Sequence, residues 1–238
     1  MSAYRYALYF APRTSSGWWR FGARWLGRDA ATGENVEQPA IAGLAPEAFH
    51  ALTTEPRKYG FHGTLKAPFA LREGTTGKAL ADALARFCRA RRSIPLPPFE
   101  VTRLADFLAL VPATRESRVN ELAADCVREF EAFRAPLAAA ELDRRRRKGG
   151  LSPRQDRYLE EWGYPYVFAE YRFHLTLTGS LGEAPPHQVT ALIAGAREAL
   201  GALPAAPLRV DGVCLFEQPE PAAPFRLATR FVFRGARR

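Results

Sequence analysis

The stretch that decides the fold is Phe61-His62-Gly63-Thr64-Leu65, which returns later in the chain as Phe173-His174-Leu175-Thr176-Leu177. The two copies use two of the four histidines in the 238-residue sequence. Successive side chains of an extended strand alternate between its two faces. Each copy is therefore expected to form a strand with His and Thr on one face and apolar side chains on the other. If the two strands lie side by side, two imidazoles and two hydroxyls meet in one groove.

The same order of elements follows each copy of the motif. The first copy is followed by a predicted helix over 78–91 and a hairpin of strands 99–104 and 107–111. The second is followed by a helix over 186–200 and a hairpin of strands 208–217 and 225–234. An internal duplication explains this recurrence economically. We expect an α+β, bilobal duplicated fold, in which two antiparallel sheets with helices on the outside face each other across a central cleft.

The chain is expected to form a single bilobal domain over 1–238, with lobes roughly at 1–135 and 165–238 that are free to exchange strands. Residues 136–164 do not fit the recurring order of strand, helix and hairpin. They are interpreted as a basic insertion, partly helical, with a mobile tip at 144–148. This tip carries four arginines and a lysine in succession. It is either a solvated loop or a lid that closes over an anionic substrate. Other predicted elements are a strand over 4–10 and helices over 16–26, 46–52 and 116–133.

The composition limits the kinds of partner that this protein is expected to bind. The formal net charge of +9 favours anionic partners such as phosphates or nucleic acid, although an Arg-rich composition also gives a positive charge without a specific partner. The sequence has no run of about 18 apolar residues and no signal-peptide pattern, so neither a transmembrane helix nor a membrane partner is expected. Cys88, Cys126 and Cys214 are interpreted as reduced core thiols of a cytoplasmic protein. Because no CxxC or HExxH pattern occurs, no metal and no cofactor is expected.

Two histidines that face one site suit general acid–base catalysis near neutral pH. Neutral imidazole can take a proton from an attacking hydroxyl, and the protonated partner can give one to the leaving oxygen. The hydroxyls of Thr64 and Thr176 can donate to non-bridging phosphate oxygens. Further phosphate contacts are predicted for three basic residues close to the motifs, Arg57, Lys66 and Arg172, with Lys66 on the same strand face as His62. These side chains could open or form a phosphodiester without a metal.

A single His-x-Thr is more often structural than catalytic, and it is the repeat that favours an acid–base site. Tyr164 and Tyr166 lie just before the second motif, where they could stack on a base or a ribose. Simple packing explains these two tyrosines equally well.

The two motifs resemble the His-x-Thr/Ser-hydrophobic signatures of the 2H phosphoesterase superfamily, which includes the RNA-ligase-like cyclic phosphodiesterases. The stretches 57–69, 151–155 and 162–166 resemble a narrower branch, the DUF1045 proteins, which are associated with phosphonate operons. Gly63 stands where that branch usually has Ala, a small-for-small change that is expected to leave His62 and Thr64 in place.

The resemblance implies metal-independent hydrolysis of a phosphodiester, with His62, Thr64, His174 and Thr176 as the site. It favours a cyclic phosphodiester of a small phosphorylated ribose or nucleotide, in phosphonate metabolism, as the substrate. Two alternatives stay open. One is an RNA-end enzyme acting on 2′,3′-cyclic or 2′,5′ linkages, and the other is a non-catalytic protein that binds nucleotides or RNA. The sequence indicates neither the oligomeric state nor which histidine is the acid.

Overall fold

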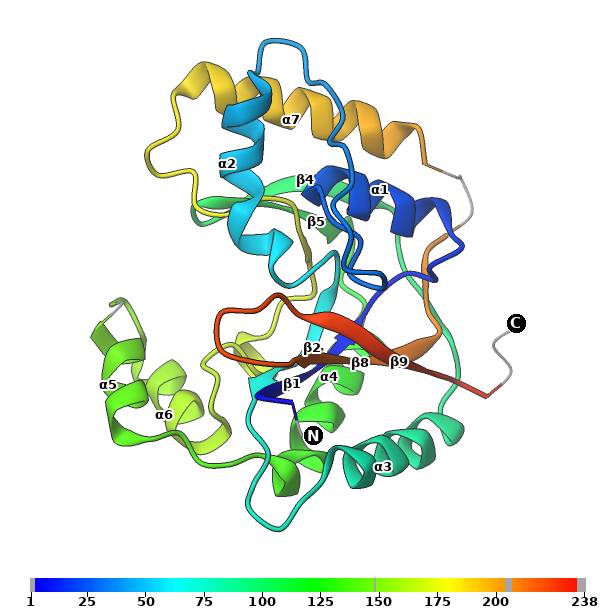
Figure 1. Ribbon diagram of the computed structural model, residues 1–238, viewed down its shortest axis with the longest axis vertical. Coiled ribbons are helices and arrows are strands. Elements are labelled where there is room, and N and C mark those ends of the chain that lie inside the picture. The colour runs from blue at the N-terminus through cyan, green and yellow to red at the C-terminus, as the bar shows by residue number, and fades with distance from the viewer. Residues whose placement is uncertain (1–2, 148, 204–206, 235–238) are drawn as a thin grey trace.

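The computed structural model describes residues 3–147, 149–203 and 207–234 (Figure 1). In this part of the chain, α-helices surround sheets whose strands all pair antiparallel. The α+β prediction is therefore confirmed. The strands are β1 (Arg5–Phe10), β2 (Gly63–Phe69), β3 (Ile94–Pro95), β4 (Phe99–Leu104), β5 (Phe107–Pro112), β6 (Leu175–Thr176), β7 (Arg209–Val210), β8 (Gly212–Gln218) and β9 (Arg226–Val232). The α-helices are α1 (Gly17–Leu26), α2 (Pro46–Arg57), α3 (Gly77–Arg89), α4 (Ser117–Glu129), α5 (Ala139–Arg147), α6 (Pro153–Trp162) and α7 (Pro186–Gly201).

Each motif strand shares a sheet with the hairpin of the other half of the chain. The first motif strand, β2, lies at the edge of a four-stranded sheet of order β2-β1-β8-β9, which contains the last hairpin. The second motif strand, β6, pairs with the first hairpin in a three-stranded sheet of order β4-β5-β6. The halves thus exchange strands, and the sheets do not coincide with the segments 1–135 and 165–238. The single domain over 1–238 stays a prediction.

The helices cover the two sheets from outside. Helices α3 and α4 pack against the four-stranded sheet, and α7 packs against β4 at the other end of the molecule (Figure 1). Helix α1 begins where the Ser16 side chain accepts from the Trp19 amide, and it ends at Gly27, whose φ of 77° is left-handed. The indole of Trp25 is buried and donates to the carbonyl of Leu177, at 3.0 Å. Helix α1 is therefore a core element that supports the second motif.

Both motif histidines stand immediately before the regular part of their strand, His62 before β2 and His174 before β6. The apolar faces are buried as predicted, with Phe61 and Leu65 in one copy and Phe173, Leu175 and Leu177 in the other. The second motif strand was predicted over 171–181. It is shorter because the side chain of Thr178 pairs with β5 at this point. Its hydroxyl oxygen accepts from the amide of Leu108 at 2.9 Å, in place of a backbone carbonyl.

The apolar backs of the two motifs touch at Gly63. A Cβ added to Gly63 would lie 2.5 Å from the Cε2 atom of Phe173 and 3.3 Å from a methyl group of Leu175. Carbon atoms that are not bonded to each other approach to about 3.5–4.0 Å at best. Glycine at this position therefore allows the second motif to pack directly against the backbone of the first.

The insertion forms two helices, α5 and α6, where the sequence predicted partial helix with a mobile tip. Helix α6 begins with a capping box formed by Ser152 and Gln155. Three arginines of the basic run are engaged by neighbouring groups: Arg144 and Arg145 with Glu141, Arg145 with the carbonyl of Gly163, and Arg146 with Asp156 and Glu160. Lys148 lies outside the described residues. These ion pairs leave the lid hypothesis without support from Arg144, Arg145 and Arg146.

The three cysteines are buried and form no disulfide with one another, as the sequence predicted. Burial raises the pKa of Cys88 to about 11, so its thiol stays protonated at neutral pH. No helix in the described part of the chain is both long and apolar enough to cross a membrane.

Candidate active site

The rings of the two motif histidines are held in the same way. Nδ1 of His62 lies 2.8 Å from the carbonyl oxygen of Gly60, and Nδ1 of His174 lies 2.9 Å from that of Arg172. A carbonyl oxygen only accepts hydrogen bonds, so Nδ1 is the nitrogen that carries hydrogen in each neutral ring. Gly60 adopts a φ of 78°, which glycine reaches without strain, and this conformation precedes the turn into β2. In each copy, Nε2 is therefore the nitrogen available for proton transfer.

His62 lies in an aromatic setting. The ring of Tyr9 stacks on it with centroids 3.7 Å apart and an interplanar angle of 22°, and the ring of Tyr59 lies at 6.3 Å. Burial lowers the pKa of His62 to about 4, although the hydrogen bond to Gly60 acts in the opposite direction. Nε2 lies 3.2 Å from the hydroxyl oxygen of Thr64. His62 is therefore neutral at pH 7, and its Nε2 can accept a proton.

His174 is half-buried at the edge of the three-stranded sheet. Its ring lies 5.6 Å from that of Phe107, which begins β5. Burial lowers the pKa of His174, while the hydrogen bond to the Arg172 carbonyl raises it. A positive charge on His174 also lowers the pKa of His62, which places the two imidazoles within electrostatic range of each other.

Two further features show that the motifs lie close together, a shared cavity and a hydrogen bond. A cavity of about 260 Å³, named here the histidine cavity, is bordered by His62 from the first motif and Thr176 from the second, together with Tyr59 and Phe107. The hydroxyl of Tyr171 donates to the carbonyl oxygen of Thr64 at 2.8 Å. The structure thus gathers the two histidines and the two threonines that the sequence singled out.

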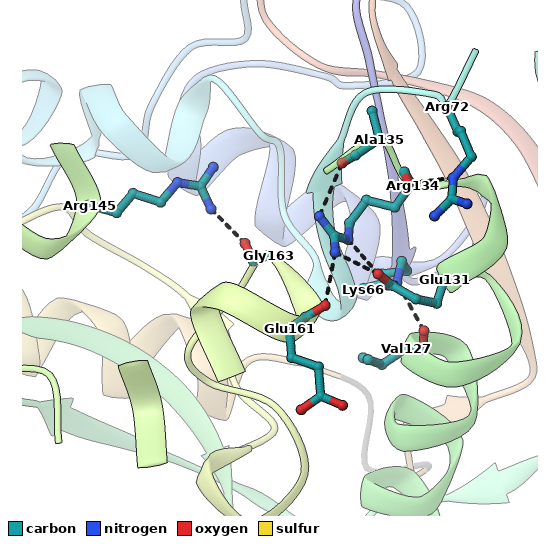
Figure 2. A network of polar contacts seen from close by, with 9 residues as sticks. All are labelled: Lys66, Arg72, Val127, Glu131, Arg134, Ala135, Arg145, Glu161 and Gly163. Atoms are coloured by element: carbon teal, nitrogen blue, oxygen red, sulfur yellow. Dashed lines mark hydrogen bonds and ion pairs between the residues drawn. The ribbon is translucent and has the colours of Figure 1, made fainter. Parts of the chain in front are cut away.

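Lys66 does not share the face of His62 and Thr64, so this prediction is wrong. The side chain is only 4% exposed, and Nζ donates to the Val127 carbonyl at 3.0 Å and to Glu131 at 2.8 Å (Figure 2). The cause is an irregularity in the pairing of β1 with β2. Tyr9 pairs with Thr64 while the adjacent Leu8 pairs with Lys66, so Leu65 is an extra residue. Such a bulge interrupts the alternation of side chains and turns Lys66 toward α4.

Figure 2 shows that the contacts of Lys66 belong to a network that reaches the insertion. Glu131 also binds the guanidinium of Arg134, which is only 7% exposed. Arg134 donates in turn to the carbonyl of Glu161 in α6 at 2.9 Å. Burial lowers the pKa of Lys66, whereas its hydrogen bond to Glu131 raises it. The network therefore fixes the end of α6 relative to β2, which is a structural role.

Arg57 is also directed away from the histidine cavity. Its Nε donates to the carbonyl of Leu26 at 2.6 Å, and its Nη2 donates to Thr53 at 2.7 Å and to the carbonyl of His50 at 3.0 Å. These contacts join the ends of α1 and α2. The guanidinium is thus occupied by the protein itself, and the predicted phosphate contact of Arg57 is not formed from this position.

Of the other predicted site residues, two border a second cavity and one does not. Arg172 and Tyr166, which is 47% exposed, border a larger cavity of about 780 Å³, named here the arginine cavity. Tyr164 is half-buried, and its ring meets that of Tyr166 edge-on at 5.6 Å. Burial, followed by the nearby Tyr166, raises the pKa of Tyr164 to about 12. A stacking role stays a prediction for both tyrosines, and Tyr166 is the one that borders this cavity.

Sequence reasoning missed the aromatic surroundings of the site. Tyr9, Tyr59, Tyr171 and Phe107 contact the motifs, yet none belongs to either His-x-Thr stretch. Tyr9 comes from a strand that appears ordinary in the sequence, and only its pairing with Thr64 brings it to His62. Knowledge of the strand order would have been needed to find it. Among the described residues, no group of three or more His, Cys, Asp or Glu side chains is arranged to hold a metal ion.

The fold and the site define an α+β protein with paired histidines between two antiparallel sheets. A family model, described as DUF1045, protein of unknown function, matches residues 64–226. The chain belongs to this family, as the motifs indicated.

Two curated relatives cover nearly all of this chain, and both carry the name ribose 1,5-bisphosphate phosphokinase PhnN. The protein from Janthinobacterium sp. (strain Marseille) is 41% identical over 97% of this chain and 51% of its own length. The protein from Laribacter hongkongensis (strain HLHK9) is 36% identical over 94% of this chain and 50% of its own length. The chain thus spans about half the length of the curated relatives it matches. A crystal structure of E. coli LigT complexed with NADP+ aligns over 98% of this chain and 99% of that one, with 12% identity and a TM-score of 0.37.

Proposed function

We propose that this chain is a phosphodiesterase that hydrolyses a cyclic phosphodiester of a small phosphorylated ribose or nucleotide, without a metal. The observation that carries the proposal is the matched pair of imidazoles. Each has Nδ1 bound to the backbone carbonyl two residues earlier, which leaves Nε2 for chemistry. Binding alone does not require two imidazoles that are held in the same tautomer, each with one ring nitrogen left for proton transfer.

The lowered pKa of His62 supports the assignment of this residue as the base. In this mechanism, a water oxygen attacks phosphorus while one water proton moves to Nε2 of neutral His62. The bond from phosphorus to the leaving ribose oxygen breaks, and that oxygen takes the proton from Nε2 of His174. The products are a phosphomonoester and a free hydroxyl. Exchange of protons with solvent then restores neutral His62 and protonated His174.

The substrate itself favours this distribution of protons. A phosphodiester carries one negative charge, and an anion next to an imidazole raises its pKa. Binding therefore promotes protonation of His174, whose pKa is lowered in the unliganded protein. The hydroxyls of Thr64 and Thr176 are the donors proposed for the non-bridging oxygens, since Thr64 lies beside His62 and Thr176 borders the histidine cavity.

The names of the curated relatives support a phosphorylated ribose as the substrate class. The phosphokinase activity in those names is that of proteins of which this chain matches about half. The present sequence contains no Gly-x-x-x-x-Gly-Lys-Ser/Thr loop, the motif by which many kinases hold nucleotide phosphates. The resemblance of the motifs to the 2H phosphoesterases supports hydrolysis, and the DUF1045 membership supports a role in phosphonate metabolism.

The test is a panel of substrates assayed in EDTA. It comprises a ribose cyclic phosphate, a nucleoside 2′,3′-cyclic monophosphate and an oligoribonucleotide with a 2′,3′-cyclic end. The proposal predicts turnover of one or both small cyclic compounds at a rate above that of the oligoribonucleotide. Preferential turnover of the oligoribonucleotide would favour the RNA-end alternative. ATP-dependent phosphorylation of ribose 1,5-bisphosphate, with no hydrolysis of any cyclic phosphate, would refute the proposal in favour of a kinase.

A further inference from the structure

The arginine cavity is too large to serve only a scissile phosphate. Its volume of about 780 Å³ lies within the range of about 300–1,000 Å³ that is typical of sites for whole small molecules. It is bordered by the polar side chains Thr102, Thr114, Arg115, Asn120, Tyr166 and Arg172. These residues come from β4, from the loop between β5 and α4, from the first turn of α4 and from the segment that leads into β6.

The arginine cavity lies over the face of the sheet that carries the second motif. Thr102 pairs with Ala109, and Ala109 pairs with Thr176, so these three residues form one row across β4, β5 and β6. Residues opposite each other in adjacent strands point to the same face. Burial alternates through Arg172, Phe173 and His174, which are exposed, buried and half-buried. Arg172, His174 and Thr176 therefore share the face on which Thr102 borders the cavity.

The charges in this cavity favour an anion. Within the described part of the chain, the guanidiniums of Arg115 and Arg172 have no hydrogen-bond or ion-pair partner, although both border the cavity. The two carboxylates at its border are already engaged, because Glu116 pairs with Arg118 at 2.8 Å and Glu170 with Arg154 at 3.6 Å. Unpartnered guanidiniums are well suited to bidentate contacts with phosphate oxygens.

We propose that the arginine cavity holds a second phosphate group of the substrate, a phosphomonoester bound by Arg115 and Arg172. This inference rests on the proposed function. Two residues of extended chain span about 7 Å, so Arg172 and His174 can contact groups separated by one pentose ring. The substrate is then a ribose that carries a cyclic phosphodiester at the histidines and a terminal phosphate in the arginine cavity. Thr114 and Asn120 supply uncharged donors to the same group.

The test compares ribose 2,3-cyclic phosphate with its 5-phosphorylated form, as the ratio of their kcat/KM values. The parent is expected to prefer the 5-phosphorylated compound. Arg115→Gln and Arg172→Gln should each reduce this preference by about 10- to 100-fold, the effect of losing one hydrogen bond to a charged group. Arg103→Gln is the matched control. Arg103 is exposed on β4 between two residues that border the cavity, so alternation directs it to the other face.

Equal use of the two compounds by the parent, or unchanged preference in both Gln variants, would overturn the inference. If the parent hydrolyses neither of these compounds nor the nucleoside 2′,3′-cyclic monophosphate, the proposed function fails. Calorimetric measurement of ribose 5-phosphate binding then tests the arginine cavity independently of turnover. Binding that Arg115→Gln abolishes and Arg103→Gln preserves supports the phosphate site. Tighter binding of adenosine than of ribose 5-phosphate, lost in Tyr166→Ala, would instead identify a base-stacking site and overturn the inference.

Discussion

Tyr171 donates its hydroxyl hydrogen to the carbonyl oxygen of Thr64, at 2.8 Å, and so joins the segment that carries His174 to the strand that follows His62. The two residues belong to different sheets, because Thr64 lies in β2 and Tyr171 precedes β6. Burial raises the pKa of Tyr171 well above its ordinary value, so the hydroxyl remains a donor throughout the neutral range. The separation of the two imidazoles therefore depends in part on this hydrogen bond.

Replacing Tyr171 with Phe should disturb catalysis more than stability. Loss of one hydrogen bond is expected to lower the free energy of unfolding by about 0.5–1.5 kcal/mol. The rate constant kcat should fall further, by about 10-fold or more, because displacement of a catalytic group by about 1 Å can cost up to 100-fold. Tyr4→Phe is the control, since Tyr4 is 48% exposed. A Tyr171→Phe enzyme with the parental kcat would show that the bond does not set the geometry of the site.

Gly63→Ala tests the close packing of the two motifs. The added methyl group would lie 2.5 Å from the Phe173 ring, so this ring must shift. Overpacking of this kind typically lowers the free energy of unfolding by about 1–3 kcal/mol. Urea unfolding measures the change, and Gly201→Ala is the control, because a Cβ at Gly201 would meet nothing within 4 Å. Equal stability of the two variants would contradict the packing described here.

Lys66→Met distinguishes a structural lysine from a substrate-binding one. The variant removes the ion pair with Glu131 but keeps most of the apolar side chain, and Arg134 remains as a partner for Glu131. The free energy of unfolding should fall, by less than the 3–5 kcal/mol or so that is typical when a buried charge loses its only partner. KM should not change. A raised KM with unchanged stability would restore the role that the strand alternation predicted. Lys78→Met, at an exposed lysine, controls for the loss of charge.

Local patterns were sufficient to predict much of the fold. The alternation in both motifs identified the buried faces, and the hairpin of β4 and β5 forms as predicted around Ala105, whose φ is 52°. The exchange of strands between the halves was not determined by any local pattern, because it depends on which hairpin each motif strand meets. Lys66 was misplaced for a related reason. The bulge at Leu65 arises from the pairing with β1, and a single strand carries no sign of it.

The sequence identified the site residues that lie within the two motifs, but not the residues that surround them. His62, Thr64, His174 and Thr176 are brought together, whereas Arg57 is held by the carbonyl of Leu26 and by Thr53. A basic residue near a motif can satisfy backbone groups as well as it can bind phosphate, and the sequence does not distinguish the two uses. The contact of Tyr9 with His62 needs the tertiary structure for the same reason.

The pH dependence of kcat/KM should be bell-shaped, because the reaction needs one neutral and one protonated imidazole. Burial lowers the pKa of both histidines below the ordinary value of 6.5, so the maximum for the free enzyme should lie on the acid side of that value. The profile of kcat should be displaced to higher pH, since the bound anion raises both pKa values. Flat profiles between about pH 5 and 8, where histidines change charge, would exclude paired imidazoles if chemistry limits the rate.

Stability should also depend on pH through His62. Its pKa is about 4 in the folded chain, against an ordinary value of 6.5. Between these values the unfolded chain binds a proton that the folded chain does not, so the free energy of unfolding falls as the pH is lowered from 6.5 to 4. The limiting slope is about 1.4 kcal/mol per pH unit for one group. His62→Gln should reduce this slope, whereas His187→Gln, at an exposed histidine, should preserve it. Equal slopes in the parent and His62→Gln would contradict the lowered pKa.

The central claim is that His62 and His174 together transfer the protons of a phosphodiester hydrolysis. The most direct test is the kcat of the parent, His62→Ala, His174→Ala and the control His187→Ala on the best substrate of the panel, in EDTA. Each motif variant should lose about 10²–10⁴-fold, and the double variant little more, because the two groups act as a unit. His187→Ala should equal the parent. Near-parental kcat in either folded motif variant, or complete loss of parental activity in EDTA with rescue by a divalent ion, would contradict the account.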